Sequence, residues 1–229
     1  MTPLVSVIVP IHNGARFLAE ALRSVAAQDY AAFEVIVVDD GSTDDGAAIA
    51  EACGATVLRQ QQRGAGAARN AGVNFARGDL LAFLDQDDLW LPSKLRRQAE
   101  TLEAHPESIC LARQSYFLEP GVAAPPAWFG KPILLDADHT GWAPSCLAMR
   151  MTTFARVGRF DERLHHISDV DWFARAADLA IPIETPPETL VRRRIHGTND
   201  SGSPGAMQEF FTILRGAAAR KRSAALEVS

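Results

Sequence analysis

The stretch Leu4–Asn13, LVSVIVPIHN, decides the fold because it begins as a β-branched run and ends in polar residues. A run of Val and Ile with almost no charge is typical of a strand buried on both faces of a sheet. A helix pattern follows, with Asn13 as its expected N-cap and with one apolar face made of Phe17, Leu18, Ala21, Leu22 and Val25. A second buried run, Phe33–Val38, comes next. This succession of strand, helix and strand predicts a parallel sheet covered by helices.

The same alternation continues along the chain and becomes less regular in its second half. In the first half we expect strands at Ala55–Arg59 and Asp79–Leu84, and helices from Ser42 or Thr43 to about Cys53, over Gly64–Ala76 and from Pro92 to about His105. In the second half we expect strands at Ile109–Leu118, Ser145–Arg150 and Thr189–Ile195, helices at Thr152–Val157, Asp169–Leu179 and from Pro204 onward, and a long loop at Glu119–Gly141. No repeat or linker divides the sequence, so one domain is expected over residues 1–229.

Composition and charge exclude several classes of protein. With 47% hydrophobic and 22% charged residues, the chain is too apolar for global disorder. The net charge of −5 argues against nucleic acid as the main partner. Cys53, Cys110 and Cys146 form no C-x-x-C pair, which favours buried thiols in a reducing cytosol over disulfides or a zinc site. No apolar run reaches the ~20 residues of a membrane span, and the first residues lack the basic segment of a signal peptide.

Polar residues follow three of the expected strands at the point where each strand ends. The first is followed by His12 and Asn13, the second by Asp39, Asp40 and Gly41, and the fourth by Asp85, Gln86, Asp87 and Asp88. In open α/β sheets, ligands bind beyond the carboxyl ends of the strands, so these residues are expected to line one crevice. Residues i and i+2 of extended chain point the same way, so Asp85 and Asp87 can share one cation. Their oxygens suit Mg²⁺ or Mn²⁺.

A glycine-rich segment before an arginine forms a second candidate cluster. Gly64-Ala65-Gly66 precedes Arg69, and small residues let the backbone approach a ligand while the guanidinium could meet a phosphate. A tight loop before a packed, alanine-rich helix explains the same residues, and short glycine patterns have low specificity. Taken alone, the segment favours this packing interpretation.

Together these segments resemble family 2 glycosyltransferases. The resemblance rests on VSVIVPIHNGARFLAEALRSVAAQDY at 5–30, FEVIVVDDGSTDDG at 33–46, RGAGAARNAG at 63–72, GDLLAFLDQDDLW at 78–90, FDERLHHISDVDW at 160–172 and RRRIHGTNDS at 192–201. It implies an inverting, metal-dependent enzyme of the GT-A fold. Such a fold has a Rossmann-like, mostly parallel central sheet with helices on both faces and a smaller acceptor-side region.

The resemblance also implies a role for individual residues of the donor site. Pro10, His12 and Asn13 correspond to the first loop around the nucleotide. Asp39 matches the acceptor of a nucleobase N–H, with Asp40 and Gly41 supporting that loop or the ribose. Arg69 falls near the base or diphosphate, and Gln86 of the D-x-D loop is also expected to bind the donor. Asp85 and Asp87 match the metal-binding D-x-D motif, with Asp87 the expected direct ligand, and His196 resembles a histidine that reaches the metal or diphosphate. The implied cofactor is Mn²⁺ or Mg²⁺.

The catalytic base of the family normally belongs to a Glu-Asp pair before a helix. Here the pair reads Ser168-Asp169, so Asp169 is the expected base and Asp171 the second choice. Three tryptophans could stack on sugar rings. We place Trp90 and Trp172 near the site, although core packing is favoured for Trp172, and Trp142 is balanced between acceptor contact and packing.

The implied reaction moves a sugar from a nucleotide-diphosphate sugar, expected to be UDP-linked, to an acceptor hydroxyl or similar nucleophile. Residues 1–105 would bind the donor, 106–203 the acceptor, and 204–229 would form a helical tail. The acceptor could be a saccharide, a lipid carrier, a peptide or a small molecule. The expected location is the cytoplasm, with peripheral binding at the inner membrane face as a further option. A homodimer is a further hypothesis that the sequence does not decide. The alternative is a non-catalytic nucleotide-sugar-binding module, whereas the absence of G-x-G-x-x-G counts against a dinucleotide-dependent oxidoreductase.

Overall fold

The central sheet is built from seven strands and is mostly parallel. A computed structural model gives the structure of the chain and describes residues 2–126, 129, 135, 137–199, 205, 209 and 213. The sheet has the order β10-β6-β9-β4-β1-β2-β3. Its strands are β1 (Val5–Ile11), β2 (Phe33–Asp40), β3 (Thr56–Gln60), β4 (Leu80–Phe83), β6 (Ile109–Leu111), β9 (Leu147–Arg150) and β10 (Ile183–Glu184). Only β9 runs antiparallel to its neighbours, β4 and β6.

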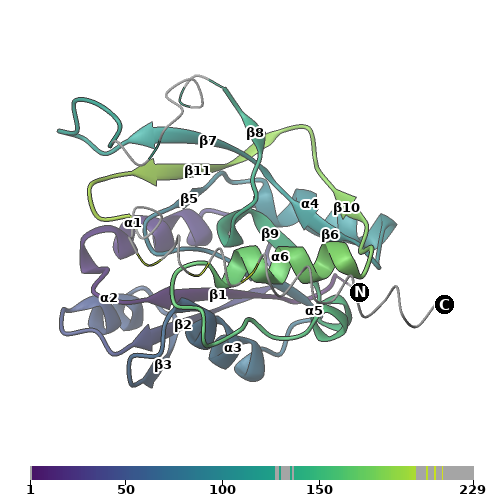
Figure 1. Cartoon of the computed structure of the whole chain (residues 1–229), viewed down its shortest axis with the longest axis horizontal. Helices are drawn as coiled ribbons and strands as arrows, with labels where there is room; N and C mark the ends of the chain where they lie inside the picture. The colour runs from purple at the N-terminus through teal and green to yellow at the C-terminus, as the bar shows by residue number, and fades with distance from the viewer. Residues whose placement is uncertain are drawn as a thin grey trace.

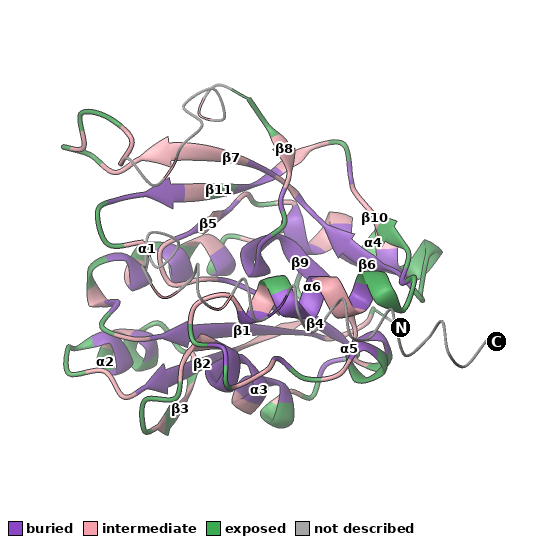
Figure 2. Cartoon of the chain, viewed as in Figure 1, coloured by how far each residue is buried: buried purple, intermediate pink, exposed green. Residues whose placement is uncertain are grey.

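Helices cover both faces of this sheet (Figures 1 and 2). Successive side chains of a strand point to opposite faces, so an apolar strand contributes to two cores. Val7 and Val9 point to the face covered by α1 (Ala15–Ala26), α2 (Gly46–Ala52) and α4 (Lys94–Ala104). Ile8, between them, joins the opposite core with Val73 and Trp172. That face carries α3 (Ala65–Phe75), α5 (Met151–Val157) and α6 (Ser168–Asp178). The apolar run at residues 4–10 therefore reflects burial on both sides.

A second, four-stranded sheet lies above the central one in the view of Figure 1. Its order is β5-β11-β7-β8, with β5 (Leu89–Trp90), β7 (Arg113–Leu118), β8 (His139–Thr140) and β11 (Thr189–Ile195). Trp90 of β5 and Val191 of β11 are buried in the same core as Val7, so the two sheets share apolar packing. This sheet brings residues from the end of the described chain next to the D-x-D loop.

Two of the expected strands are wrong in their extent. Ile109–Leu118 is two strands, because the chain leaves the central sheet at Ala112: its N–H donates to the Cys146 carbonyl and its carbonyl accepts from Gly141 N–H. Ser145–Arg150 begins instead as a 3₁₀ turn, Pro144–Cys146, before β9. In both places the same apolar residues serve a crossing between sheets, which a period-two pattern does not reveal.

The loops that start α1 and α2 also differ from expectation. Asn13 does not cap α1: it has φ +48°, and its Oδ1 accepts from the N–H and hydroxyl of Thr43. Helix α2 begins at Gly46 rather than at Ser42 or Thr43. Asp44 explains the shift, because one of its oxygens accepts from Gly46 N–H and the other from Ala15 N–H, at the start of α1. The two loops therefore satisfy each other's backbone.

The remaining segments are described in part. The segment expected as a long loop, Glu119–Gly141, contains β8 near its end and is described at 119–126, 129, 135 and 137–141. The helix expected from Pro204 onward lies outside the described residues apart from positions 205, 209 and 213, which are helical. No helix in the described part of the chain is long and apolar enough to span a bilayer.

Candidate functional site

A cavity of about 850 Å³ opens beyond the carboxyl ends of β1, β2 and β4. Its walls bring together most of the predicted site residues: Pro10, His12, Asn13, Asp40, Arg69, Asp85, Gln86, Asp87, Asp169 and His196. Asp39, Gly41 and Asp171 are not among the lining residues. The convergence follows from topology, since parallel neighbouring strands end at the same edge of the sheet.

The acidic pair at the end of β2 accepts hydrogen bonds mainly from backbone N–H groups. Asp39 is buried, and its Oδ1 accepts from Ser42 N–H at 2.9 Å. Asp40 is also buried, and its carboxylate accepts from Gln60 Nε2 and from the N–H groups of Arg63 and Gly64, all within 2.8 Å. Each of these donors occupies an acceptor position of a carboxylate oxygen. The pair shapes the two loops around the cavity, and Asp40 reaches the cavity wall while holding them.

Gln86 ties the D-x-D loop to the end of β1. Its Oε1 accepts from His12 N–H at 2.9 Å, and its Nε2 donates to the His12 carbonyl. The His12 ring nitrogen Nδ1 lies 3.0 Å from the Asp40 carbonyl oxygen. Gly14 is required beside this link, because a Cβ there would lie 2.0 Å from Gln86 Oε1. The three strand ends are therefore locked together by side-chain to backbone hydrogen bonds.

Arg69 projects from α3 into the site and is itself buried. Its guanidinium donates to Asp85 Oδ1 at 2.7 Å and lies over the ring of Phe160 at 5.6 Å. Its Nε is buried and has no partner among the described residues. A guanidinium on the wall of a cavity is suited to binding an anionic group. Gly66 packs against Ser168, as the packing interpretation predicts, whereas Gly64, Ala65 and Arg69 line the cavity.

Asp87 is where the end of β11 meets the D-x-D loop. Its Oδ2 lies 2.9 Å from His196 Nε2 and accepts from Asn199 Nδ2 at 3.1 Å. Asn199 in turn accepts from His196 N–H, which fixes the turn after β11. Sequence reasoning missed Asn199, although it belongs to the same R-x-H-G-x-N segment as His196. The segment converges on one carboxylate from more than a hundred residues away.

The predicted metal ligands fit a divalent cation in part. In the described part of the chain, no three His, Cys, Asp or Glu side chains are arranged as a ligand set. Asp85 and Asp87 nevertheless line one cavity wall, and their hydrogen bonds use Oδ1 of the first and Oδ2 of the second. Two carboxylates suffice for Mg²⁺ or Mn²⁺, which keep other positions for water and phosphate oxygens. The carboxylate oxygens of Asp85 and Asp87 are therefore suitable ligands for the predicted Mn²⁺ or Mg²⁺.

Asp88 points away from the cavity, unlike its neighbours. It is buried, and its carboxylate accepts from the Ser145 hydroxyl, Arg193 Nε and Arg194 N–H. Burial raises the pKa of Asp88 to about 7, as do the nearby Asp87 and Asp85, while Arg193 opposes the shift. This carboxylate joins the D-x-D loop to β11. The sequence pattern had predicted instead that Asp88 lines the crevice with Asp85 and Asp87.

Two arginines of β11 were missed by sequence reasoning, and they point in opposite directions. Arg193 lines the cavity, where Asp88 and Asp85 keep it charged by raising its pKa against the effect of burial. Arg194 is buried on the other side, between the rings of Phe17 and Phe117, and pairs with Glu20 and Glu119. The run of three arginines at 192–194 could not show which one faces the site. Strand alternation decides it.

Asp169 stands in the first turn of α6 and lines the cavity. Burial raises the pKa of its carboxyl, Arg69 lowers it and Asp85 raises it again. An aspartate held in this way is a stronger proton acceptor when ionised than one in water. Asp171, by contrast, is buried outside the cavity lining and pairs with Arg175 at 2.8 Å. The geometry favours Asp169 as the cavity's base.

Ser168 occupies a packing position. It is buried, and a Cβ on Gly66 of α3 would lie 2.9 Å from its hydroxyl oxygen. The residue that departs from the family pattern therefore fills a close contact between α3 and α6. The acid that follows it still faces the cavity.

The three tryptophans have different surroundings. Trp90 is buried, and its indole N–H donates to the Ser145 carbonyl, so it is not available to stack on a sugar. Trp172 is fully buried among phenylalanines such as Phe154, as core packing predicts. Trp142 is 55% exposed and packs edge-on against Phe173 of α6. Only Trp142 of the three presents a ring to solvent.

Comparison with known proteins agrees with this arrangement. The model of the family described as "Glycosyl transferase family 2" matches residues 6–176. The chain belongs to this family. The match extends from β1 through the D-x-D loop to α6, and so includes every element around the cavity except β11 and the turn after it.

Relatives and solved structures extend the comparison over most of the chain. An uncharacterized glycosyltransferase of Rickettsia prowazekii is 30% identical over 94% of this chain and 71% of its own length. A glycosyltransferase named GlyG, from Streptococcus pneumoniae, is 38% identical over 39% of the chain and 32% of its own length. The crystal structure of S. aureus TarS 1-349 in complex with UDP is 25% identical with a TM-score of 0.72, covering 94% of this chain and 64% of that one. The predicted mixed α/β fold with a mostly parallel central sheet is confirmed.

Proposed function

We propose that this member of the family transfers a sugar from a UDP-linked donor to a hydroxyl or similar nucleophile, with inversion at the anomeric carbon. The observation that supports the proposal is the cavity itself, whose lining includes Asp169, the D-x-D carboxylates Asp85 and Asp87, and the two arginines Arg69 and Arg193. The charges of Arg69, Asp85 and Arg193 all act on the Asp169 carboxyl. UDP is favoured because TarS, whose fold this chain shares, is described in complex with UDP.

Asp169 is proposed as the general base. Its ionised carboxylate would take a proton from the acceptor, which then attacks the anomeric carbon while the diphosphate leaves from the opposite face. A single displacement inverts the configuration, and no nucleophile of the enzyme is needed. Arg69 and Arg193 are already in place to meet the charge that develops on the leaving diphosphate.

The same proposal includes a divalent cation. Asp85 and Asp87 would hold Mn²⁺ or Mg²⁺, with His196 and Asn199 orienting Asp87 through its Oδ2. When bound, the cation neutralises charge on the diphosphate. Asp40 and Gln86 keep the loops of the nucleotide side in register. We assign donor binding to residues 1–105 and acceptor binding to 106–203.

The proposal is tested with a panel of nucleotide sugars in the presence of Mn²⁺. UDP release and the mass shift of candidate acceptors (saccharides, lipid carriers, peptides and small metabolites) report transfer. We expect release from at least one UDP-sugar and its loss when EDTA is added. Tight UDP binding without release from any donor would instead favour a non-catalytic binding module, and absence of UDP binding would contradict the proposal as a whole.

A further inference from the structure

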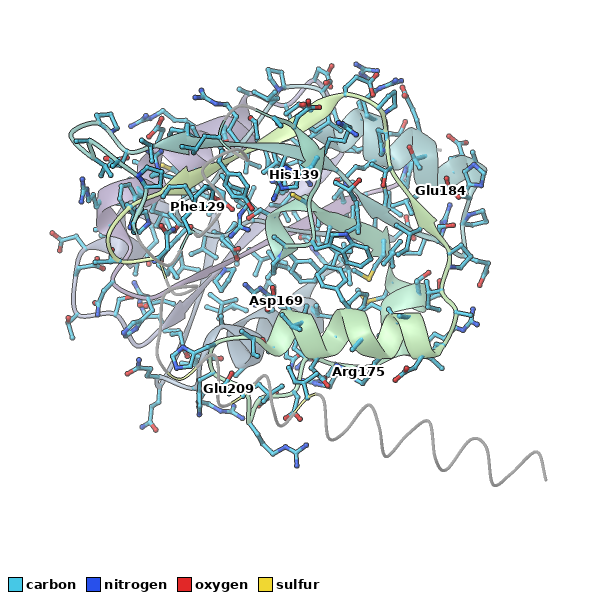
Figure 3. The ribbon with its side chains drawn as sticks, turned by 45° about the horizontal axis from the view of Figure 1, so that its top comes forward. Phe129, His139, Asp169, Arg175, Glu184 and Glu209 are labelled. Carbon is cyan, nitrogen blue, oxygen red and sulfur yellow. The ribbon has the colours of Figure 1, made fainter. Side chains whose placement is uncertain are left out.

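One carboxylate from the far end of the chain holds the turn that leads into α6. Glu209 Oε1 accepts from His165 N–H at 2.8 Å, and Oε2 accepts from the N–H groups of His166 and Ile167 at 3.0 and 3.1 Å. Three consecutive backbone donors thus share one side chain that is more than forty residues away in sequence. Figure 3 labels Glu209 and Asp169 near the same end of α6.

Helix α6 has no side-chain cap of its own. Its N-cap residue is Ile167, whose side chain cannot accept a hydrogen bond, although Asp169 and Asp171 place acidic groups in the first turn. Glu209 adds a further carboxylate at this end of the helix, bound to the N–H groups of 165–167. The turn that leads into α6 is therefore held by a tertiary contact.

The supported turn lies on the wall of the cavity. His165 and His166 both line it, and Asp169 follows two residues after Ile167. The backbone from 165 to 169 therefore determines where the carboxylate of Asp169 stands relative to the D-x-D loop. On the other side, Ser168 is fixed against Gly66 of α3, so the turn is held from both directions.

We propose that Glu209 is a positioning residue for Asp169. Its carboxylate fixes the turn 165–167 and thereby the first turn of α6, so that Asp169 is aligned with the attacking atom of the acceptor. The inference rests on the proposed function, because it assigns Glu209 an effect on the proton-transfer step. The hydrogen bonds that Glu209 makes to the described residues go to the turn 165–167, and none of them goes to Asp85 or Arg69 on the donor side of the cavity.

The test compares Glu209→Ala, Glu209→Gln and the control Glu51→Ala in the full chain. Glu51 is an exposed residue of α2 that pairs with Arg59, so its loss removes a charge without touching α6. The rate measured is UDP release with water as acceptor, from whichever of UDP-GlcNAc, UDP-glucose and UDP-galactose the wild-type chain hydrolyses fastest. Asp169→Asn establishes that this rate depends on the base. Calorimetry gives the Kd for UDP, and hydrogen exchange reports the amides of 165–167.

We expect Glu209→Ala to lower kcat by about 10- to 100-fold, the effect of a small misplacement of a reacting group. KM for the donor and Kd for UDP should be unchanged, and the amides of 165–167 should exchange faster. Glu209→Gln should restore most of kcat, because its amide oxygen still accepts from backbone N–H. Glu51→Ala should behave as wild type.

Faster exchange in Glu209→Ala with an unchanged kcat would overturn the inference and leave the proposed function intact, since the clamp would then only stabilise the fold. A parallel loss of UDP binding would also overturn it, because the damage would extend to the donor side. If the wild-type chain neither binds UDP nor releases it, the proposed function fails, and the inference fails with it.

Discussion

The acidic segments at the ends of β2 and β4 look alike in sequence and differ in what their carboxylates do. Asp39 and Asp40, the last two residues of β2, are buried and their oxygens accept from backbone and amide N–H groups. After β4, Asp85 and Asp87 are half-buried and meet the cationic or ionisable side chains of Arg69 and His196. The two strands lie on either side of β1 and run parallel to it.

The difference shows that an acidic strand end is not by itself a binding site. A carboxylate whose lone pairs are filled by backbone N–H groups shapes a loop, because those donors cannot move away to admit a ligand. A carboxylate paired with mobile side chains can exchange its partner for a cation. The same difference occurs within the single loop after β4. Asp88 accepts from Ser145, Arg193 and Arg194, and it joins this loop to β11 instead of lining the cavity.

The largest effect is expected from an acid that belongs to neither loop. Asp169→Asn should lower the rate of sugar transfer by about 10²- to 10⁴-fold, because the amide cannot take the acceptor proton. Binding of UDP, measured by calorimetry, should stay the same. Asp171→Asn is the matched control, since Asp171 pairs with Arg175 outside the cavity lining. Normal turnover in the first variant and loss in the second would move the base to Asp171.

The next effect tests the loop after β4. Asp87→Asn should weaken the Mn²⁺-dependent part of UDP affinity by about 10- to 100-fold, because a cation ligand loses its charge. UDP titrations with and without Mn²⁺ measure it. Asp88→Asn serves as the adjacent control and should keep the Mn²⁺ dependence while losing stability. If Asp87→Asn titrates like wild type in Mn²⁺, this loop does not bind a cation.

A smaller effect, on stability, is expected at the acidic end of β2. Asp40→Asn should lower the free energy of unfolding by about 1–3 kcal/mol, because an amide cannot accept from all the N–H groups that the carboxylate satisfies. Urea denaturation measures it, with the exposed Asp45→Asn as control. The contrast between the loops would break down if Asp40→Asn kept full stability and lost Mn²⁺-dependent UDP affinity instead.

The smallest effect is a pH dependence of stability at Asp169. Burial raises the pKa of this carboxyl in the folded state, so folded protein holds the proton more tightly than unfolded chain. Its contribution to stability is full below the unfolded value of about 3.9 and is lost as pH rises through the folded value. Asp169→Asn should therefore have the higher Tm at pH 8, and the difference should shrink toward pH 4. Thermal melts across this range measure it, and a Tm difference that stays constant with pH would contradict the raised pKa.

Sequence patterns described the first half of the chain well, because each element there is local. β1, β2 and β4 are apolar runs buried on both faces, and α1 has a one-sided stripe. The second half contains crossings between two sheets, at Ala112 and at Pro144–Cys146, where apolar residues do not follow a single period. The start of α2 was placed too early, because Asp44 uses its two oxygens for Gly46 N–H and for Ala15 N–H of the neighbouring loop.

Among the site residues, the sequence named His12, Arg69, Asp85, Asp87, Asp169 and His196, and all six line one cavity. It missed Arg193, Asn199 and Glu209, whose roles depend on partners that lie far away in sequence. The alternation of β11 separates Arg193 from Arg192 and Arg194, but only the tertiary structure shows that the Arg193 face lines the cavity. For Glu209 the sequence held no signal, because an isolated glutamate carries no record of the N–H groups it will meet.

The sequence by itself determined the alternation of strand and helix, the acidic strand ends and the motifs that place the chain in its family. Those features depend on short-range periodicity and on residue types at fixed spacing. Only the tertiary structure decided which carboxylates face the cavity, which arginine of β11 joins them, and that Glu209 holds the turn before α6. The physical reason is that a carboxylate's role depends on the donors that surround it, and here those donors come from strands and helices brought together by the fold.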